Sequence, residues 1–476
     1  MISKYVQEQK RYTQEELCRI FECSEEYAIS IIRKLKEYSI LKAVRASADQ
    51  KDRSDLIEED IEIADVGIDD NEFLYIFTFV GIIVIAGRVL KCYPKYLNIP
   101  EPVNELRQIL KVLEKYNEKE QIIRMFNDSS ENHSFNLLAV MLFLLTDYHE
   151  NGSYNNTKDI VESNGMGEII WDKTINETFT LLSNDRPYYT DLQTKKRISN
   201  DYDYYKRLHE CILTKISKEL VAAQLVDLFE IGEVELSDED IEDFGDKDYL
   251  LYRIEKELNI QFNTRKQLVL KTLYTYIERS GSLFDVNGLS IFGTNSFNLV
   301  WENVCKVILD NQLDVPLGLL PLPIPLKSGY DKQMKLIHLV EKPLWSYTGK
   351  CAQDTLIPDS ITISSSQFII TDAKYYVTKL EKNQVPKAQP GIESITKQYL
   401  YQMAYQQFIE DHQFESIINC FIMPTETDGV LDKGVVSMKM FEKLGLKSIE
   451  VRFLSAGEAF EHYLSGTKIS LSRLRL

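Results

Sequence analysis

The chain has 476 residues, which is too long for a single hydrophobic core, so we expect two or three domains. Hydrophobic residues make up 44% and charged residues 27%, as in an ordinary globular protein. No apolar run approaches the about 20 residues of a membrane-spanning helix, and the polar start argues against a signal peptide. Seven scattered cysteines and six isolated histidines favour a reducing, cytoplasmic location and predict no zinc cluster. The net charge of −18 argues against autonomous DNA binding.

Residues 1 to about 45 have the pattern of a winged helix-turn-helix. Thr13 and Glu16 have the spacing of a capping box at the start of a short helix, and Ser24 can cap a second, amphipathic helix. In a winged helix-turn-helix the second helix recognises DNA. This one opens with Glu25 and Glu26, so a protein-interaction module is an equally good interpretation.

The middle of the chain is β-rich at first and then mainly helical. Phe73 to Lys95 predicts short strands separated by turns at Gly81 and at Ala86-Gly87. Asn184 to Tyr189 is polar and aromatic and fits either a partner contact or a surface loop. Helices are predicted at residues 103–116, 135–148 and 202–228.

The character of the sequence changes at about residue 285. An amphipathic helix over Phe297 to Leu309 precedes a β-hairpin within Thr355 to Val377. A helix over Ile392 to Glu410 then leads to a buried strand over Ser416 to Met423. Because such crossovers are right-handed, this strand is expected parallel to the second hairpin strand. A further strand over Lys447 to Phe453 and a terminal helix complete the region.

The hairpin brings charged residues together. If its polar turn pairs Ile363 with Phe368, counting outward places Asp359 directly opposite Asp372, about 5 Å apart at Cβ. The two-residue period of a strand carries Lys374 to the same face. The sequence therefore predicts two carboxylates and one ammonium group in one place.

Two carboxylates at that distance repel each other unless a cation lies between them, and Mg²⁺ is the expected one, with Mn²⁺ as its substitute. Lys374 would orient water and stabilise charge on a phosphate. A lone D-x-K is common by chance and is usually a surface ion pair. Here Pro358-Asp359, the hydrophobic flanks and the matched register favour a site.

Asp…Asp-x-Lys is the arrangement of the PD-(D/E)xK nucleases, and helix, hairpin, helix, strand is the order of their core. In that family the first helix often adds an acid, which would be Glu302 here, as a further metal ligand. The helix after the lysine often carries a glutamine, and Gln398 and Gln402 lie four apart. We favour Gln402, although both glutamines and Glu302 are also ordinary polar helix positions.

Over most of its length after about residue 70 the chain resembles the LlaJI-type restriction endonuclease subunits, relatives of McrC. The stretches that carry the resemblance are Phe79-Val80-Gly81-Ile82-Ile83, Gly87-Arg88, Tyr93-Pro94-Lys95, Asn184 to Tyr189, Arg207-Leu208-His209-Glu210 and Val300-Trp301-Glu302 with the nuclease block. The resemblance implies a nuclease subunit that cuts double-stranded DNA with a McrB-like AAA+ GTPase hexamer and stimulates its hydrolysis. The chain has no Walker A sequence, so GTP would bind only to that partner.

The expected fold is therefore α+β and multidomain. Residues 1–70 are predicted as a winged helix-turn-helix, residues 71–284 as a McrC-like β-rich and helical partner-docking region, and residues 285–476 as an α/β PD-(D/E)xK endonuclease domain. The expected function is Mg²⁺-dependent DNA cleavage in a restriction system for phage defence, without membrane association. The alternatives are a winged-helix DNA-binding regulator with a degenerate nuclease domain and a stand-alone repair nuclease.

Overall fold

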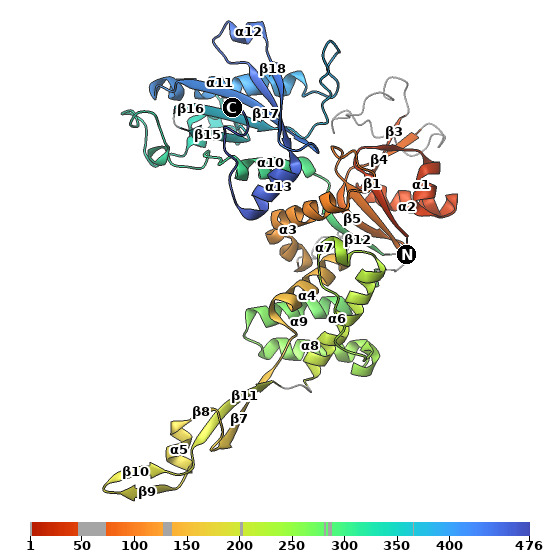
Figure 1. Ribbon diagram of the computed structural model, residues 1–476, viewed down its shortest axis with the longest axis vertical. Coiled ribbons are helices and arrows are strands. Elements are labelled where there is room, and N and C mark those ends of the chain that lie inside the picture. Colours follow the sequence, from red (N-terminus) through yellow and green to blue (C-terminus); the bar gives the residue numbers. More distant parts are fainter. Residues whose placement is uncertain are drawn as a thin grey trace. The chain divides into compact units, whose positions relative to one another are not determined.

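The computed structural model describes residues 2–45, 73–126, 136–199, 203–279, 282–283, 288–364 and 366–476. The chain forms two compact units (Figure 1): unit 1 comprises Met1–Asn127 and Ile291–Leu476, and unit 2 comprises Asp128–Ser290. The predicted domain boundaries after residues 70 and 284 fall outside the described residues. The three-domain division therefore remains a prediction.

Among its described residues, the first part of unit 1 contains two small sheets and three helices. The capping box at Thr13 is confirmed, whereas Ser24 occupies the N-cap position of the second helix without a side-chain capping bond. The strand orders are β2-β4-β3 and β1-β6-β5-β12. The elements are β1 (Ile2–Gln7), β2 (Arg11–Tyr12), α1 (Gln14–Phe21), α2 (Glu25–Glu37), β3 (Leu41–Arg45), β4 (Phe73–Phe77), β5 (Val80–Ile85), β6 (Arg88–Tyr93), α3 (Val103–Phe126) and β12 (Leu289–Thr294).

Gly81 lies inside β5, so the turn predicted there is wrong. Its φ of 138° is one that side chains with a Cβ rarely adopt, and a Cβ would approach the carbonyl oxygen of Phe292 to 2.0 Å. Gly293 of β12 makes the reciprocal close approach to Val80. The glycine therefore permits close contact between two strands rather than a reversal of the chain. The turn predicted at Ala86-Gly87 is present, with φ values of 49° and 71°.

The C-terminal part of unit 1 is built on a five-stranded sheet of order β15-β16-β17-β19-β18. Helix α11 packs on one face, and α10 and α13 pack on the other (Figure 1). As predicted, β17 runs parallel to β16, and β19 parallel to β17. The elements are α10 (Phe297–Ile308), β13 (Leu344–Trp345), β14 (Lys350–Cys351), β15 (Ser360–Ser364), β16 (Gln367–Ala373), α11 (Ile392–Asp411), β17 (Ser416–Thr425), β18 (Val430–Val436), α12 (Lys439–Glu442), β19 (Ile449–Ser455) and α13 (Ala456–Ser465).

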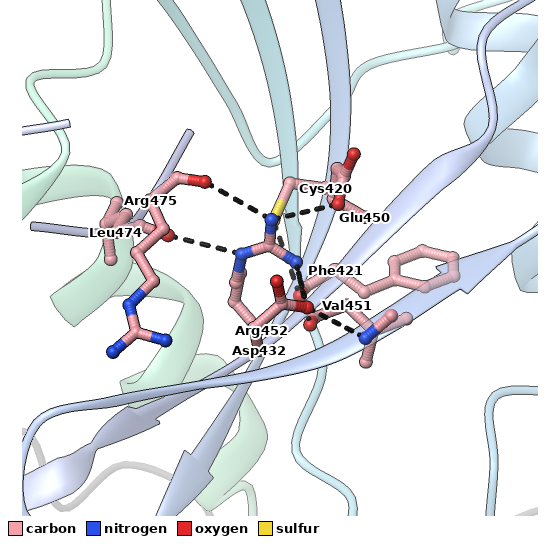
Figure 2. A network of polar contacts seen from close by, with 9 residues as sticks. Cys420, Phe421, Asp432, Glu450, Val451, Arg452, Leu474 and Arg475 are labelled. Carbon is pink, nitrogen blue, oxygen red and sulfur yellow. Dashed lines mark hydrogen bonds and ion pairs between the residues drawn. The ribbon is translucent and has the colours of Figure 1, made fainter. Parts of the chain in front are cut away.

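A buried arginine ties the end of the chain to this sheet (Figure 2). Arg452 of β19 forms ion pairs with Asp432 and Glu450, both at 2.9 Å. Its guanidinium also donates to the carbonyl oxygens of Leu474 and Arg475, both at 3.2 Å. These partners satisfy the donors of a side chain that is only 4% exposed, as a buried charge requires.

Unit 2 contains a bundle of helices. The helix predicted at 135–148 is present as α4, and the one predicted at 202–228 is divided into α6 and α7 by a break at Ala223 to Leu225. Two further helices, α8 and α9, pair with each other. The elements are α4 (Leu137–Asn151), α6 (Tyr204–Ala222), α7 (Val226–Phe229), α8 (Lys247–Ile260) and α9 (Thr264–Glu278). In the described parts of both units no helix has the length and apolar character to cross a membrane.

An arm of residues 157–199 interrupts this bundle between α4 and α6 (Figure 1). Its strands form a β7-β11-β8 sheet and a β9-β10 hairpin, and Asn184 and Asp185, with φ of 50° and 56°, form the hairpin turn. The segment 184–189 is thus a turn and a strand rather than a loop. The elements are β7 (Thr157–Ser163), β8 (Glu168–Ile169), α5 (Trp171–Glu177), β9 (Thr180–Ser183), β10 (Arg186–Tyr189) and β11 (Gln193–Ser199).

Candidate functional site

The predicted register of the β15-β16 hairpin is confirmed. Ile363 pairs with Phe368 and Ser360 pairs with Thr371, so the next position places Asp359 opposite Asp372. The strands are shorter than predicted, because β15 begins only at Ser360 and β16 ends at Ala373. A backbone bond of 2.8 Å from Lys374 N to Ile422 O nevertheless continues the ladder to β17. The hairpin thus brings all three predicted residues to the same end of β16.

The side chains of the three residues meet at this end of β16. Nζ of Lys374 lies 2.8 Å from Oδ2 of Asp372, and Asp372 is 4% exposed. Oδ2 of Asp359 accepts a hydrogen bond of 2.9 Å from the backbone N–H of Ala373. Because Phe368 and Ile370 of the same face pack in the core under α11, Asp372 and Lys374 emerge where that apolar face ends.

Helix α10 brings Glu302 toward the two aspartates. Nε1 of Trp301, fully buried in the same helix, donates to Ile422 O at 3.3 Å, the carbonyl that also accepts from Lys374. Burial first, and then the negative charge of Asp359, raise the pKa of Glu302 to about 7. Glu302 therefore lies within the electrostatic field of the two aspartates, and its role as a metal ligand remains a prediction.

Negative charge exceeds positive charge at this site. Burial, followed by the charge of Asp359, raises the pKa of Asp372 to about 7, although Lys374 acts in the opposite direction. Burial opposes the charged form of Lys374, but the two aspartates together outweigh it and raise the pKa of the ammonium group. Lys374 is therefore a cation at neutral pH. Its one positive charge faces the three carboxyl groups of Asp359, Asp372 and Glu302.

This donor set fits a hard divalent cation that is held partly by substrate. Mg²⁺ usually takes one or two carboxylates and completes its shell with water and phosphate oxygens. Asp359 and Asp372 can supply those oxygens, and their mutual repulsion would be relieved by a cation. Within the described residues no group of three acidic, histidine or cysteine side chains is close enough to hold an ion. Glu302 thus does not complete a three-carboxylate site in this arrangement.

The two glutamines of α11 have different surroundings. Oε1 of Gln402 accepts from Asn419 Nδ2 at 2.8 Å and from Lys447 N at 2.9 Å, which fixes β17 to the segment before β19. Gln402, the residue favoured from sequence, therefore has a structural role in this geometry. Nε2 of Gln398 instead donates to Ile370 O at 3.0 Å on the strand that carries Asp372, and its buried Oε1 has no partner among the described residues.

Tyr401 is a site residue that sequence reasoning missed. It lies on α11 in the cluster that contains Ile361 and Ile370 and is 9% exposed. Burial, and then the charges of Asp372 and of the other two carboxylates, raise the pKa of its phenol. The spacing Gln398-Tyr399-Leu400-Tyr401 was a signal, but it does not show which face of the helix meets the strand.

A second feature missed from sequence lies directly after the lysine. Oε2 of Glu8, at the end of β1, accepts from the hydroxyl of Tyr375 at 2.5 Å and from the backbone N–H of Lys95 at 3.2 Å. Lys95 also lies 4.7 Å from the centre of the Tyr375 ring. These contacts join the first sheet of unit 1 to the strand end that positions Lys374.

Comparison with known proteins gives one family and several relatives. The model of the LlaJI restriction endonuclease family matches residues 79–324 and 326–456. The type II restriction enzyme BsuMI component YdjA of Bacillus subtilis (strain 168) is 25% identical over 414 residues, which cover 84% of this chain and 83% of that protein.

Two solved structures from Thermococcus gammatolerans show distant similarity. A half-complex from a tetradecameric assembly of McrB AAA+ hexamers with bound McrC has 9% identity and a TM-score of 0.37, over 98% of this chain and 99% of that chain. The McrBC complex has 11% identity and a TM-score of 0.26, over 64% and 86%. Since the family model spans residues of both units, the chain belongs to the LlaJI restriction endonuclease family.

Proposed function

We propose that this chain is the DNA-cleaving subunit of a restriction system, a Mg²⁺-dependent phosphodiester hydrolase with a PD-(D/E)xK site. The observation that carries the proposal is the convergence of Asp359, Asp372 and Lys374 at the end of β16, with Lys374 held 2.8 Å from Asp372. Membership in a restriction endonuclease family supports it. The geometry alone is compatible with hydrolysis of any phosphate ester, and membership in a restriction endonuclease family favours double-stranded DNA as the substrate.

The reaction would add water across one P–O ester bond of the DNA backbone. The water oxygen bonds to phosphorus, the opposite ester bond breaks, and the water protons pass to the leaving oxygen and to solvent. Lys374, a cation because its pKa is raised, donates hydrogen bonds to the phosphate oxygens and neutralises charge that develops on them. Asp372 anchors that ammonium group. Mg²⁺ held by Asp359 and Asp372 would lower the pKa of the attacking water.

The test is cleavage of duplex DNA with Mg²⁺ by wild type and Asp372→Ala, each with and without the AAA+ protein encoded beside this chain and its nucleotide. The variant should lose about 10³-fold or more of the rate, because it removes a metal ligand and the anchor of Lys374. Asp314→Ala is the matched control, since that carboxylate is 76% exposed in a surface ion pair with Lys335. An Asp372→Ala protein that cuts as fast as the control would refute the site. Duplex binding without any cutting by wild type, even with partner and nucleotide present, would favour the regulator.

We also propose that a McrB-like AAA+ GTPase hexamer is the partner and that the arm of residues 157–199 contacts it. Among the described side chains of the arm no hydrophobic one is fully buried. Nine large apolar side chains of the arm are exposed instead, which is typical of a protein interaction surface. They are Ile160, Val161, Met166, Trp171, Ile175, Phe179, Leu181, Leu182 and Tyr188.

The partner proposal is tested with the AAA+ protein encoded beside this chain. Phe179→Asp/Leu182→Asp should abolish stimulation of GTP hydrolysis and partner-dependent cleavage, because both side chains, 73% and 78% exposed, would carry charge into the contact. Phe262→Asp is the control, since Phe262 is 91% exposed in unit 2 outside the arm. Equal stimulation by the arm variant and the control would contradict the contact. Full cutting by wild type without any nucleotide would favour the stand-alone repair nuclease.

A further inference from the structure

The segment between α10 and β15 contains a small hairpin that the proposed chemistry does not use. Leu344 pairs with Cys351 and Trp345 pairs with Lys350, which defines β13 and β14. The backbone N–H groups of Thr348 and Gly349 both donate to Trp345 O, at 3.1 and 2.9 Å. The reversal is therefore a hydrogen-bonded turn with a defined backbone conformation.

The hairpin exposes aromatic side chains. Tyr347 at its tip is fully exposed, and Trp345 and Leu344 are 65% and 68% exposed. Trp345 is one of three tryptophans in the chain, and Trp301 by contrast is fully buried. Large aromatic rings that remain in water at a fixed turn are typical of a contact surface rather than of a core.

The charge of the surrounding sequence is opposite to that of the chain. Residues 326–397 contain ten lysines and seven acidic residues, two of which are Asp359 and Asp372, whereas the whole chain carries a net charge of −18. Lys342 and Lys350 flank the exposed rings. Within the part of the chain that the structure describes, neither ammonium group forms an ion pair. Both are therefore available for an anionic partner.

The base of the hairpin lies close to the carboxylates along the chain. Ala352 N donates to Pro343 O at 2.8 Å, and the hydroxyl of Thr355 donates to Glu341 O. Four residues lead from Thr355 to Asp359, so their Cα atoms are no more than about 14 Å apart. A duplex at the carboxylates presents about four phosphates per strand over that length. The hairpin can thus contact the same DNA that is cut.

We propose that the β13-β14 hairpin is a DNA-binding element of the nuclease, in which Lys342 and Lys350 neutralise phosphates beside the scissile bond and Trp345 and Tyr347 pack against sugars and bases. The inference rests on the proposed DNA cleavage and identifies how a chain of strongly acidic composition contacts its substrate. Unpaired lysines beside exposed aromatic rings are the combination with which proteins hold nucleic acid, since lysine supplies attraction and the rings supply stacking.

The test measures binding of a fluorescein-labelled duplex by anisotropy, with the full chain carrying Asp372→Ala so that no cutting interferes. Affinity is followed between about 50 and 200 mM salt, because the slope counts phosphate contacts. In this background Lys342→Gln/Lys350→Gln should lower the slope of log affinity against log salt by about 2. Trp345→Ala/Tyr347→Ala should lower affinity about tenfold at every salt concentration with an unchanged slope.

The control is Lys439→Gln/Lys443→Gln/Leu444→Ala on and after α12, which removes two exposed lysines and one apolar side chain that is 65% exposed. It should bind DNA like the parent. All substituted side chains are exposed, so every variant should keep the melting temperature of the parent.

Equal affinity of the parent and both hairpin variants would overturn the proposal, and so would an equal loss in the control. Unchanged DNA binding with reduced partner-stimulated GTP hydrolysis would assign the hairpin to a protein partner instead. This outcome is separable from failure of the proposed function. If wild type cleaves DNA but the hairpin variants bind DNA like the parent, only the role of the hairpin is refuted. If wild type does not cleave DNA, the nuclease assignment is refuted, and that result does not depend on the hairpin variants.

Discussion

The sheet that carries the candidate site and the arm of unit 2 are both β-structures, but they are stabilised in different ways. In the sheet, Phe368 and Ile370 are fully buried beneath α11. In the arm, Phe179 and Leu182 are 73% and 78% exposed, and no described hydrophobic side chain is fully buried. The sheet thus has its own hydrophobic core, whereas the large apolar side chains of the arm are exposed to solvent.

The difference in packing between the sheet and the arm suits the two regions to different roles. A site that must hold Lys374 within 2.8 Å of Asp372 needs neighbours that are fixed by packing. An arm without a core is attached to its bundle through polar contacts at its base, where Asn156 donates to Asp203 and Glu257. The sheet therefore fits chemistry, and the arm fits recognition.

The largest effect is expected at the lysine of the sheet. Lys374→Ala should reduce DNA cleavage by about 10³-fold, since it removes the only cation that faces Asp372 among the described residues. Single-turnover cleavage with Mg²⁺ measures it. Lys379→Ala is the control five residues further along the same segment. Binding of Mn²⁺, followed by electron paramagnetic resonance, should persist in Lys374→Ala. A variant with intact cleavage would mean that Lys374 is an ordinary ion pair.

The contrast in packing predicts a contrast in stability. Phe368→Ala should lower the free energy of unfolding by about 4 kcal/mol, because it leaves a cavity beneath α11. Leu182→Ala in the arm should change it by less than about 0.5 kcal/mol. Thermal and urea unfolding of the full chain measure both variants. A Leu182→Ala protein that is destabilised as strongly as Phe368→Ala would show that the arm is packed in the free chain.

A pH effect is expected where the arm joins its bundle. Nδ1 of His209 accepts from the backbone N–H of Tyr154 at 2.8 Å, just before β7. Burial lowers the pKa of His209 to about 4. The positive charge of Arg265 also lowers this pKa, while the negative charge of Asp147 raises it. Between pH 6.5 and pH 4, His209 is therefore protonated in the unfolded chain but stays mainly neutral in the folded chain. Stability should fall by about 2 kcal/mol from pH 7 to pH 5, and by about 3 kcal/mol by pH 4.

The measurement is hydrogen exchange of α6, corrected for the intrinsic effect of pH. His209→Asn retains an acceptor for Tyr154 but cannot titrate, so its stability should depend less on pH in this range. His149→Asn replaces an exposed histidine on α4 and serves as the control. An unaltered pH dependence in His209→Asn would exclude this histidine as the cause.

The register of the site was predictable because it depends on local chemistry. The polar turn and the two-residue period of the strands are both contained in the residues between Asp359 and Lys374, and the structure confirms the pairing of Ile363 with Phe368. The parallel strand after α11 followed from the handedness of crossovers. The choice between Gln398 and Gln402 could not be made from sequence, because helical spacing does not identify which side chain meets β16. In the structure Gln398 contacts β16 and Gln402 contacts Asn419.

Features that join distant segments were not predictable. Glu8 reaches Tyr375 across 367 positions of sequence, and Gly81 meets β12 across more than 200, so neither has a local signal. Unit 1 is formed from two separated segments for the same reason. The arm was not recognised as an arm, since strands without a buried face lack the alternation of apolar and polar residues that marks a strand in sequence.

The smallest effect is expected at Glu302, and it tests how tightly the sheet defines its site. Since no three described carboxylates are close enough to hold an ion together, we expect Glu302 to act at a distance on Asp359 rather than as an equal ligand. Glu302→Gln should therefore lower cleavage only about tenfold, the loss typical of groups outside the ligand shell, and raise the Mg²⁺ concentration needed for half-maximal rate. Titration of Mg²⁺ in the cleavage assay measures both quantities.

A loss as large as that of Asp372→Ala would mean that α10 moves to complete a three-carboxylate site when DNA is bound. An unchanged Mg²⁺ requirement would separate Glu302 from the metal, because a carboxylate that senses Asp359 must also affect how readily Asp359 accepts a cation.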